Sequence, residues 1–248
     1  MPIHIETVLT EPGGDAVRIV TIDRPERRNA IDADHVSALT EAVTAAPPGT
    51  RALVLRGIEG HFCAGADLKG IEGPEFAVLL RGLLHGLRDA PFACIAAVEG
   101  AALGAGTQLA VSCDLRTTTP DATFGIPAAK LGLMVDLWTV QRLAALAGQG
   151  VARAMLLAAD TLPGADAHRL GLAQRLGPAS DAVVWAEEIA ARAPLTIAGH
   201  KLMLNALDAA VPVDPAVTAA FDRAWASADL VEGKAAFAER RTPVFTGE

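Results

Sequence analysis

Short apolar runs of strand length recur along the first half of the chain, each bounded by polar, glycine or proline residues. Six of them predict strands: 4–10, 16–22, 52–57, 94–98, 115–118 and 123–124. A turn of Pro12, Gly13 and Gly14 separates the first two runs. The runs at 52–57 and 94–98 are almost entirely apolar, which is typical of strands buried on both faces of a parallel sheet.

Apolar residues at helical spacing predict helices between several of these strands. The first helix starts after Asp32, a residue type that caps helix N-termini, and runs to about Ala46. A second covers 76–87, and a third follows the glycine- and alanine-rich loop 100–106. From about Leu137 the pattern predicts helices almost to the end of the chain. Strand-then-helix units at roughly even spacing indicate an α/β protein built from a repeated unit.

This order of elements divides the chain into a β/α core, 1–194, and a helical C-terminal region, 195–248. Hydrophobic residues make up 51 % of the 248 residues, enough for an ample core. The net charge of −8 argues against a general nucleic-acid binder, because phosphate neutralisation needs clustered Lys and Arg. Polar and glycine residues interrupt the long apolar stretch 91–111, so we expect no membrane span. The chain contains no Tyr, so no phenol can act as acid, base or nucleophile.

The 3 cysteines, without a C-x-x-C pair, favour buried thiols in a reduced compartment over a disulfide framework. The first ten residues lack a basic segment followed by a long apolar one, so we expect no secretory signal and a cytoplasmic protein. The hydrolase G-x-S-x-G, P-loop and H-E-x-x-H motifs are absent. Gly104-Ala105-Gly106 begins a dinucleotide fingerprint that fails at Leu109. The 6 histidines show no metal-ligand spacing, so we expect no metal site.

Two glycine- and alanine-rich loops, 62–68 and 100–110, each follow an apolar strand, and the second opens a helix. Small residues let a ligand approach the backbone closely, and free N–H groups at a helix N-terminus favour a developing negative charge. Two such N–H groups aimed at one carbonyl oxygen form an oxyanion hole, in which one donor contributes about 2.7–4 kcal/mol to a transition state. The alternative is that both loops are tight turns packed against alanine-rich helices.

The order and spacing of eight segments resemble one family along essentially the whole chain. The segments are 23–30, 62–68, 97–106, 113–116, 124–127, 131–133, 141–143 and 239–245. The sequence is identified on these segments as a member of the crotonase (enoyl-CoA hydratase/isomerase) superfamily. The resemblance implies an α/β fold, a spiral of ββα repeats, with C-terminal helices that build homotrimers or dimers of trimers.

The ligand that the resemblance implies is an acyl-coenzyme A thioester, with no other cofactor. The thioester carbonyl would lie between the backbone N–H groups of Ala66 and Ala105. Family analogy places the coenzyme near a set of basic and loop residues: Arg24, Arg28, Ala64, Asp67, Leu68, Arg240 and Arg241. The acyl pocket would include Leu80, Leu84, Met134 and Trp138. For each arginine the alternative is a solvated surface charge, and for each apolar residue it is plain core packing.

The sequence departs from the family's hydratases at two positions. Those enzymes use two glutamates around one water, and this chain carries Gln108 and Ala128 there. Glutamine cannot take a proton at neutral pH, and alanine has no titratable group. A positioned general acid or base contributes about 10²–10⁴-fold. We therefore expect no efficient hydration by the usual mechanism.

One carboxylate, Asp136, stands in the otherwise apolar run 131–138. It aligns with the nucleophilic aspartate of a dehalogenase in the same superfamily. Its alternatives are a helix cap, a pocket-wall residue with a raised pKa, or a nucleophile or base. Segments 132–138 and 152–157 resemble certain actinobacterial relatives that lack the glutamates. The intact loops beside the missing carboxylates, together with Asp136, leave three hypotheses open. In the first, the chain binds fatty acyl-CoA without hydrating it, as a carrier or as a partner of a lipid-biosynthesis protein. In the second, it is an enoyl-CoA hydratase or another acyl-CoA enzyme that uses Asp136. In the third, the function depends on the contacts of the trimer rather than on the pocket.

Overall fold

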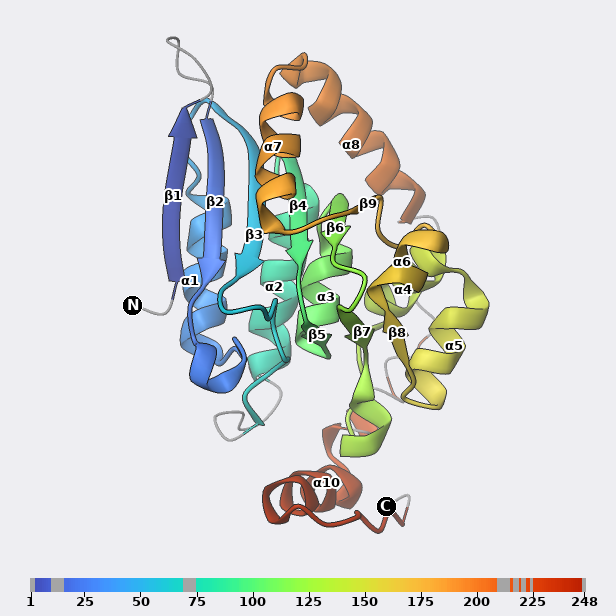
Figure 1. Cartoon of the computed structure of the whole chain (residues 1–248). Coiled ribbons are helices and arrows are strands. Elements are labelled where there is room, and N and C mark those ends of the chain that lie inside the picture. The colour runs from blue at the N-terminus through green and yellow to red at the C-terminus, as the bar shows by residue number, and fades with distance from the viewer. Residues whose placement is uncertain are drawn as a thin grey trace.

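A computed structural model describes residues 3–9, 16–68, 75–208, 215, 219, 222–223 and 225–246 (Figure 1). Its strands are β1 (Ile3–Leu9), β2 (Ala16–Ile22), β3 (Thr50–Gly57), β4 (Ala93–Val98), β5 (Ala101–Leu103), β6 (Leu115–Thr118), β7 (Thr123–Gly125), β8 (Thr161–Pro163) and β9 (Arg175–Leu176). Its α-helices are α1 (Ala33–Thr44), α2 (Glu75–Asp89), α3 (Ala105–Ser112), α4 (Leu137–Ala147), α5 (Gln149–Leu157), α6 (Gly164–Arg169), α7 (Ala179–Ala190), α8 (Pro194–Asp208) and α10 (Ala228–Glu239). Two 3₁₀ helices are η1 (Pro25–Arg27) and η3 (Pro127–Leu131).

The strands form two sheets. The larger has the order β1-β2-β3-β4-β6-β9, in which β1 is antiparallel to β2 and all other pairs are parallel. The smaller has the order β5-β7-β8. Parallel neighbours require crossover connections, and α1, α2 and α3 supply them between β2, β3, β4 and β6.

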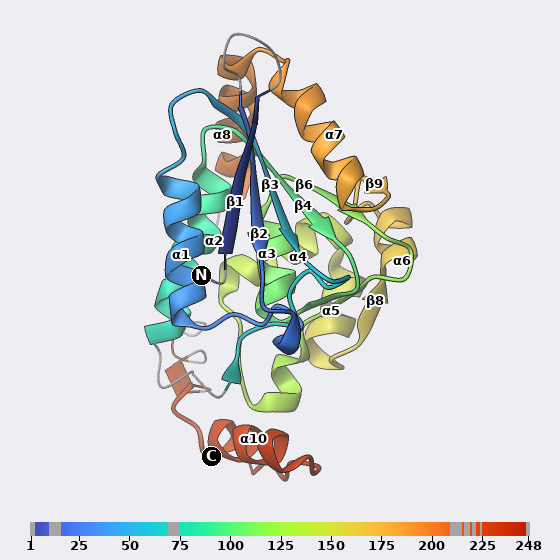
Figure 2. The ribbon, with the colours of Figure 1, turned by 60° about the vertical axis from the view of Figure 1, so that its left-hand side comes forward.

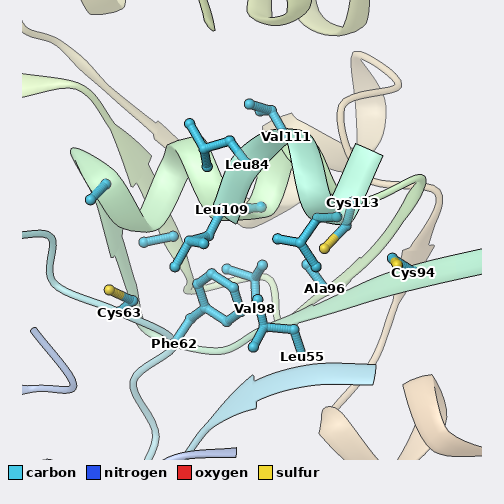
Figure 3. Packing of buried hydrophobic residues seen from close by; sticks show 14 of the residues in the cluster. Leu55, Phe62, Cys63, Leu84, Cys94, Ala96, Val98, Leu109, Val111 and Cys113 are labelled. Atoms are coloured by element: carbon cyan, nitrogen blue, oxygen red, sulfur yellow. The ribbon is translucent and has the colours of Figure 1, made fainter. Parts of the chain in front are cut away.

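Helices cover both faces of the larger sheet, with α1 and α2 on one side and α7 on the other (Figure 2). Because side chains along a strand alternate between the two faces of the sheet, the central strands contribute residues to two hydrophobic cores, one on each face. In β3, Ala52 and Val54 pack with the alanines of α7, whereas Leu53 and Leu55 pack toward α1, α2 and α3. Figure 3 shows the second core beneath α3, where Phe62 and Val98 lie against Leu109.

Most of the strand predictions are confirmed. The six predicted strands correspond to β1, β2, β3, β4, β6 and β7, and Asp32 caps α1 by accepting the His35 N–H at 3.1 Å. The prediction of helix almost throughout from Leu137 is wrong in part, because β8 pairs with β7 and β9 pairs with β6. Strands of two or three residues are too short to show an alternating pattern. The predicted 100–106 loop also contains β5.

The helices and strands described above leave two of the sequence predictions untested. The predicted turn of Pro12, Gly13 and Gly14 lies outside the described residues. The division into 1–194 and 195–248 stays a prediction. Among the residues that the structure describes, no helix is long and apolar enough to cross a membrane. The apolar stretch 91–111 is shared among β4, β5 and α3.

Candidate functional site

The two loops that the sequence singled out meet backbone to backbone. The Cys63 N–H donates to the Ala101 carbonyl at 2.9 Å, and the Leu103 N–H donates to the Cys63 carbonyl at 3.0 Å. A Cβ atom at Gly106 would lie 2.0 Å from the Cys63 carbonyl oxygen, so only glycine permits this approach. The first loop and the first turn of α3 therefore form one rigid unit.

This unit leaves two backbone donors free. Ala66 lies between two hydrogen bonds of its neighbours, from the Ile31 N–H to the Gly65 carbonyl and from the Asp67 N–H to the Ile31 carbonyl. Ala105 is the first residue of α3, so its N–H has no acceptor within the helix. Within the described ranges neither N–H has a hydrogen-bond partner, and both residues line the same cavity.

The cavity has a volume of about 250 Å³ and mostly apolar walls. It lies between the two loops, α2, η3 with the segment after it, and α10. The sequence-predicted residues that line it are Arg28, Ala64, Ala66, Leu68, Leu80, Leu84, Ala105, Gln108, Ala128, Met134 and Asp136. The structure thus brings together residues from five separate parts of the chain.

One wall of the cavity carries a short polar network. Gln108 is only 7 % exposed, and its side-chain amide donates to the Thr139 hydroxyl at 3.0 Å. The Thr139 N–H in turn donates to Asp136 Oδ1 at 2.9 Å, which makes Asp136 the N-cap of α4. Asp136 Oδ2 lies 3.6 Å from Arg81 Nε, and the Asp136 side chain is 15 % exposed. Asp136 is therefore both a helix cap and a cavity residue.

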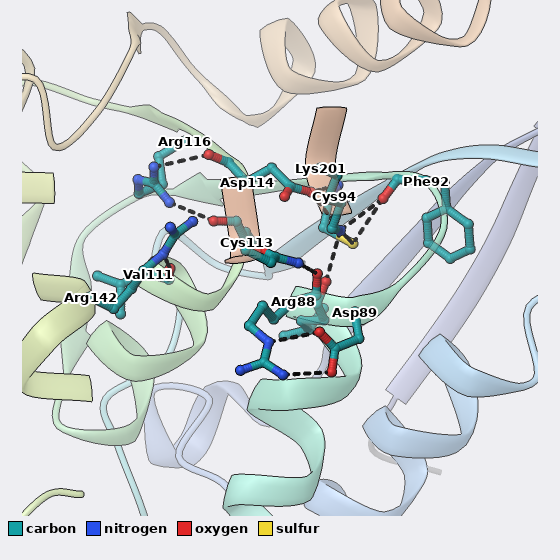
Figure 4. A network of polar contacts seen from close by, with 12 residues as sticks. Arg88, Asp89, Phe92, Cys94, Val111, Cys113, Asp114, Arg116, Arg142 and Lys201 are labelled. Atoms are coloured by element: carbon teal, nitrogen blue, oxygen red, sulfur yellow. Dashed lines mark hydrogen bonds and ion pairs between the residues drawn. The ribbon is translucent and has the colours of Figure 1, made fainter. Parts of the chain in front are cut away.

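A buried arginine side chain fixes the C-terminal end of α3. The Arg116 guanidinium is fully buried and donates to the carbonyls of Ala110 at 3.0 Å and Cys113 at 2.8 Å (Figure 4). Burial lowers the pKa of Arg116 to about 10, which leaves it charged at neutral pH. These bonds satisfy carbonyls at the end of α3, so the helix that presents Ala105 and Gln108 is held at both ends.

Five predicted site residues lie outside the cavity lining. Arg24 and Asp67 pair with each other, Nη2 to Oδ2, at 2.9 Å. Trp138 packs against the core, with its ring centroid 5.4 Å from that of His85. Arg240 is the C-cap of α10 and exposed.

Arg241 is engaged with two acids of its own region, Glu232 and Glu239. Hydrogen bonds from Arg241 and from the Val244 N–H lower the pKa of Glu232 to about 2. The Arg241 guanidinium, which lies just beyond α10, is therefore already paired with two carboxylates of that helix.

Sequence reasoning missed several cavity residues. Lys234 and Phe237 reach the cavity from α10, and Trp225 donates from its indole Nε1 to the Met134 carbonyl at 3.1 Å. No motif marks these positions, because their role depends on how α10 docks on η3. Arg81 also lines the cavity, and because it lies beside the buried apolar face of α2, the helical pattern gave no sign of its position.

The chain is similar to known proteins over nearly its whole length. The family model described as enoyl-CoA hydratase/isomerase matches residues 13–248. A Mycobacterium tuberculosis protein named probable enoyl-CoA hydratase echA6 is 43 % identical over 235 residues, covering 94 % of this chain and 97 % of that protein.

Two solved structures show the same fold. The crystal structure of an enoyl-CoA hydratase from Mycobacterium avium subsp. paratuberculosis K-10 superposes with a TM-score of 0.84 at 29 % identity, covering 98 % of both chains. Methylmalonyl-CoA decarboxylase in complex with 2-nitronate-propionyl-CoA gives 0.89 at 23 % identity, covering 100 % of this chain and 99 % of that one, which shows a shared fold alone. These similarities confirm the predicted crotonase-like α/β fold with a helical C-terminal region. The chain belongs to the enoyl-CoA hydratase/isomerase family.

Proposed function

We propose that this protein binds fatty acyl-CoA thioesters in lipid metabolism and holds the thioester carbonyl without efficiently hydrating an enoyl chain. The observation that carries the proposal is the pair of unpaired N–H groups of Ala66 and Ala105 on an apolar cavity. Two such donors match the two lone pairs of one carbonyl oxygen, and they act strongly in a site from which water is excluded.

The walls support an acyl ligand of moderate size. Leu80, Leu84 and Met134 supply apolar surface, and burying a methylene group there is worth about 0.8 kcal/mol. Arg28 and Lys234 are basic residues that line the same cavity. Their positive charges suit the phosphates of coenzyme A, despite the net charge of −8.

Hydration needs a base for the water and an acid for the α-carbon, and the cavity lacks both at the family positions. Gln108 is held by Thr139 and cannot take a proton, and Ala128 ends in a methyl group. A side chain that exchanges protons contributes about 10²–10⁴-fold, so losing two such groups removes most of the acceleration. Binding through the backbone donors is unaffected by either residue.

The second candidate is an enoyl-CoA hydratase or another acyl-CoA conversion that uses Asp136 as acid, base or nucleophile. It is favoured by one observation, the presence of the Asp136 carboxylate in the cavity wall. Against it, Oδ1 is occupied by the Thr139 N–H and Oδ2 faces Arg81. Both interactions restrict the movement of this carboxylate toward a ligand.

We extend the proposal to a homotrimer, or a dimer of trimers, with a lipid-biosynthesis protein as partner. Five large apolar side chains of α8 are exposed: Leu195, Leu202, Met203, Leu204 and Leu207. A helix with this much uncovered apolar surface is typical of an interaction face. Analytical ultracentrifugation of the full chain tests the trimer directly.

The proposal is tested by titrating the protein with coenzyme A and with saturated acyl-CoAs of increasing length in a calorimeter. We expect acyl-CoA to bind more tightly than coenzyme A, and affinity to rise with chain length until the cavity is full. In parallel, the loss of enone absorbance measures hydration of 2-enoyl-CoA by wild type and by Gln108→Glu/Ala128→Glu. Wild-type turnover at rates typical of enzymes, about 1–10³ s⁻¹, would refute the non-hydrating role. Equal binding of coenzyme A and acyl-CoA would refute the acyl site itself.

A further inference from the structure

The polar segment 24–31 runs beside the first loop and holds it at three points. The Ala64 N–H donates to the Arg28 carbonyl at 2.9 Å, and the Ile31 N–H donates to the Gly65 carbonyl at 2.9 Å. The Asp67 N–H donates to the Ile31 carbonyl at 2.8 Å. The residues on both sides of Ala66, Gly65 and Asp67, are therefore hydrogen-bonded to Ile31. The direction of the Ala66 N–H thus depends on the position of segment 24–31.

Arg24 ties that segment to the loop through its side chain. Its guanidinium donates to Asp67 Oδ2 at 2.9 Å and to the Ala30 carbonyl at 3.1 Å, and lies 3.3 Å from Asp32 Oδ2. The Arg24 side chain is 19 % exposed, and the Asp67 side chain is 14 % exposed. A charged pair in this setting has a fixed geometry, because both ends of the guanidinium are occupied.

Asn29 anchors the same segment to the strand that precedes the loop. It is fully buried with a φ of 59°, and its amide donates to the carbonyls of Ile58 at 2.9 Å and His61 at 2.6 Å. Its side-chain oxygen accepts the Arg24 N–H at 2.9 Å. Segment 24–31 is thus fixed on one side to the end of β3 and on the other to Asp67.

We propose that Arg24 and Asp67 are a positioning pair that aims the Ala66 N–H at the ligand carbonyl, and that neither contacts the coenzyme. This assignment rests on the proposed function, since it gives a role to a donor of the oxyanion hole. Neither side chain reaches the cavity, and each is bound to the other rather than turned toward solvent. Misplacing a reacting group by 1 Å costs on the order of 10²-fold, so a pair outside the cavity still governs how the carbonyl is held.

The experiment compares wild type with Arg24→Met, Arg24→Lys and Asp67→Asn. Difference infrared spectroscopy of a bound acyl-CoA labelled with ¹³C at the thioester carbonyl reports the strength of its hydrogen bonds. Calorimetry gives the affinities for acyl-CoA and for coenzyme A, and thermal unfolding gives Tm. The matched control is Arg175→Met, because Arg175 makes an ion pair of the same length, 2.9 Å to Glu188, away from the cavity.

We expect Arg24→Met to lose most of the infrared shift of the bound carbonyl. Its affinity for acyl-CoA should fall about tenfold, which is less than the effect of removing one donor of an oxyanion hole completely. Its affinity for coenzyme A should be unchanged. Arg24→Lys and Asp67→Asn, which retain part of the pairing, should fall between wild type and Arg24→Met. The control should leave band and affinities unchanged. Should Arg24→Met fail to fold, the two milder variants decide.

Two results would overturn the assignment. A parallel fall in coenzyme A affinity would show that Arg24 contacts the nucleotide, and a wild-type carbonyl band in folded Arg24 and Asp67 variants would show that the pair does not aim the donor. A different result, the absence of any carbonyl shift in the wild-type complex, would refute the oxyanion hole and hence the proposed function together with this inference.

Discussion

Gly106→Ala is a direct test of how closely the two loops must approach. An ideal Cβ at this position lies 2.0 Å from the Cys63 carbonyl oxygen, 3.0 Å from its carbonyl carbon and 3.2 Å from its Cβ. Because real Cβ contacts stay beyond 3.0 Å, the Cys63 carbonyl must retreat by about 1 Å. That carbonyl accepts the Leu103 N–H, so the movement also strains the bond that joins the loops.

The expected magnitude follows from two opposing terms. Alanine is better than glycine inside a helix by about 1 kcal/mol, and Gly106 lies within α3. Overpacking against a fixed neighbour costs about 1–3 kcal/mol and occasionally more. Since the neighbour is backbone, we place the cost at the upper end and expect the free energy of unfolding to fall by about 1–2 kcal/mol net. A shift of about 1 Å between the donors of Ala66 and Ala105 also lowers acyl-CoA affinity toward that of coenzyme A.

Urea unfolding and calorimetry with both ligands measure these two effects. The control is Gly82→Ala in α2, where the added Cβ meets no atom within 4 Å. There we expect a gain of about 0.4–1 kcal/mol and unchanged binding. If Gly106→Ala were as stable as wild type and kept its preference for acyl-CoA, the close approach of the loops would not determine the site.

Three further predictions concern charge. Lys201 donates to Asp114 at 2.7 Å and to two backbone carbonyls in the core, so Lys201→Met should cost about 3–5 kcal/mol in urea unfolding; a loss below 1 kcal/mol would contradict this. Burial lowers the pKa of His85 from its ordinary 6.5, so the unfolded chain takes up the proton first and stability should decline as the pH falls through 6.5; His85→Gln should reduce that slope, and an unchanged slope would refute it. Asp136→Ala should lose about 1 kcal/mol of helix capping while Asp136→Asn stays near wild type, and loss of a measured turnover in Asp136→Asn would instead favour the second candidate function.

The sequence predicted the parts of the site that backbone rules govern. Glycine- and alanine-rich loops after apolar strands, with a helix after the second loop, predicted free N–H groups near one ligand, and the structure places Ala66 and Ala105 in the lining of one cavity. Gln108 and Ala128 were recognised as departures because the resemblance to the crotonase family places its two glutamates at these positions. Local signals sufficed for the two loops alone, since their small residues lie next to the strands and the helix that they connect.

Local sequence patterns could not predict contacts between residues that lie far apart along the chain. Arg24 was predicted to bind the coenzyme because it is basic and lies in a family motif, and the structure pairs it with Asp67, 43 residues away. The buried Lys201 of α8, bonded to Asp114 across 87 residues, gave no local sign of burial (Figure 4). Lys is rarely buried without a partner, and a partner cannot be identified before the topology brings the two together.

In this site, the groups that would bind a carbonyl oxygen are separate from the side chains that would transfer protons. The close approach of Gly106 to Cys63 and the Arg116 bonds at the end of α3 help to fix the donors of Ala66 and Ala105. None of these depends on the side chains at 108 and 128, so those side chains can change without disturbing the donors. Among the described residues that line the cavity, the one carboxylate is Asp136, which accepts the Thr139 N–H and faces Arg81. Two backbone donors beside a carboxylate that is already bound support our proposal that the site holds a thioester rather than transforming it.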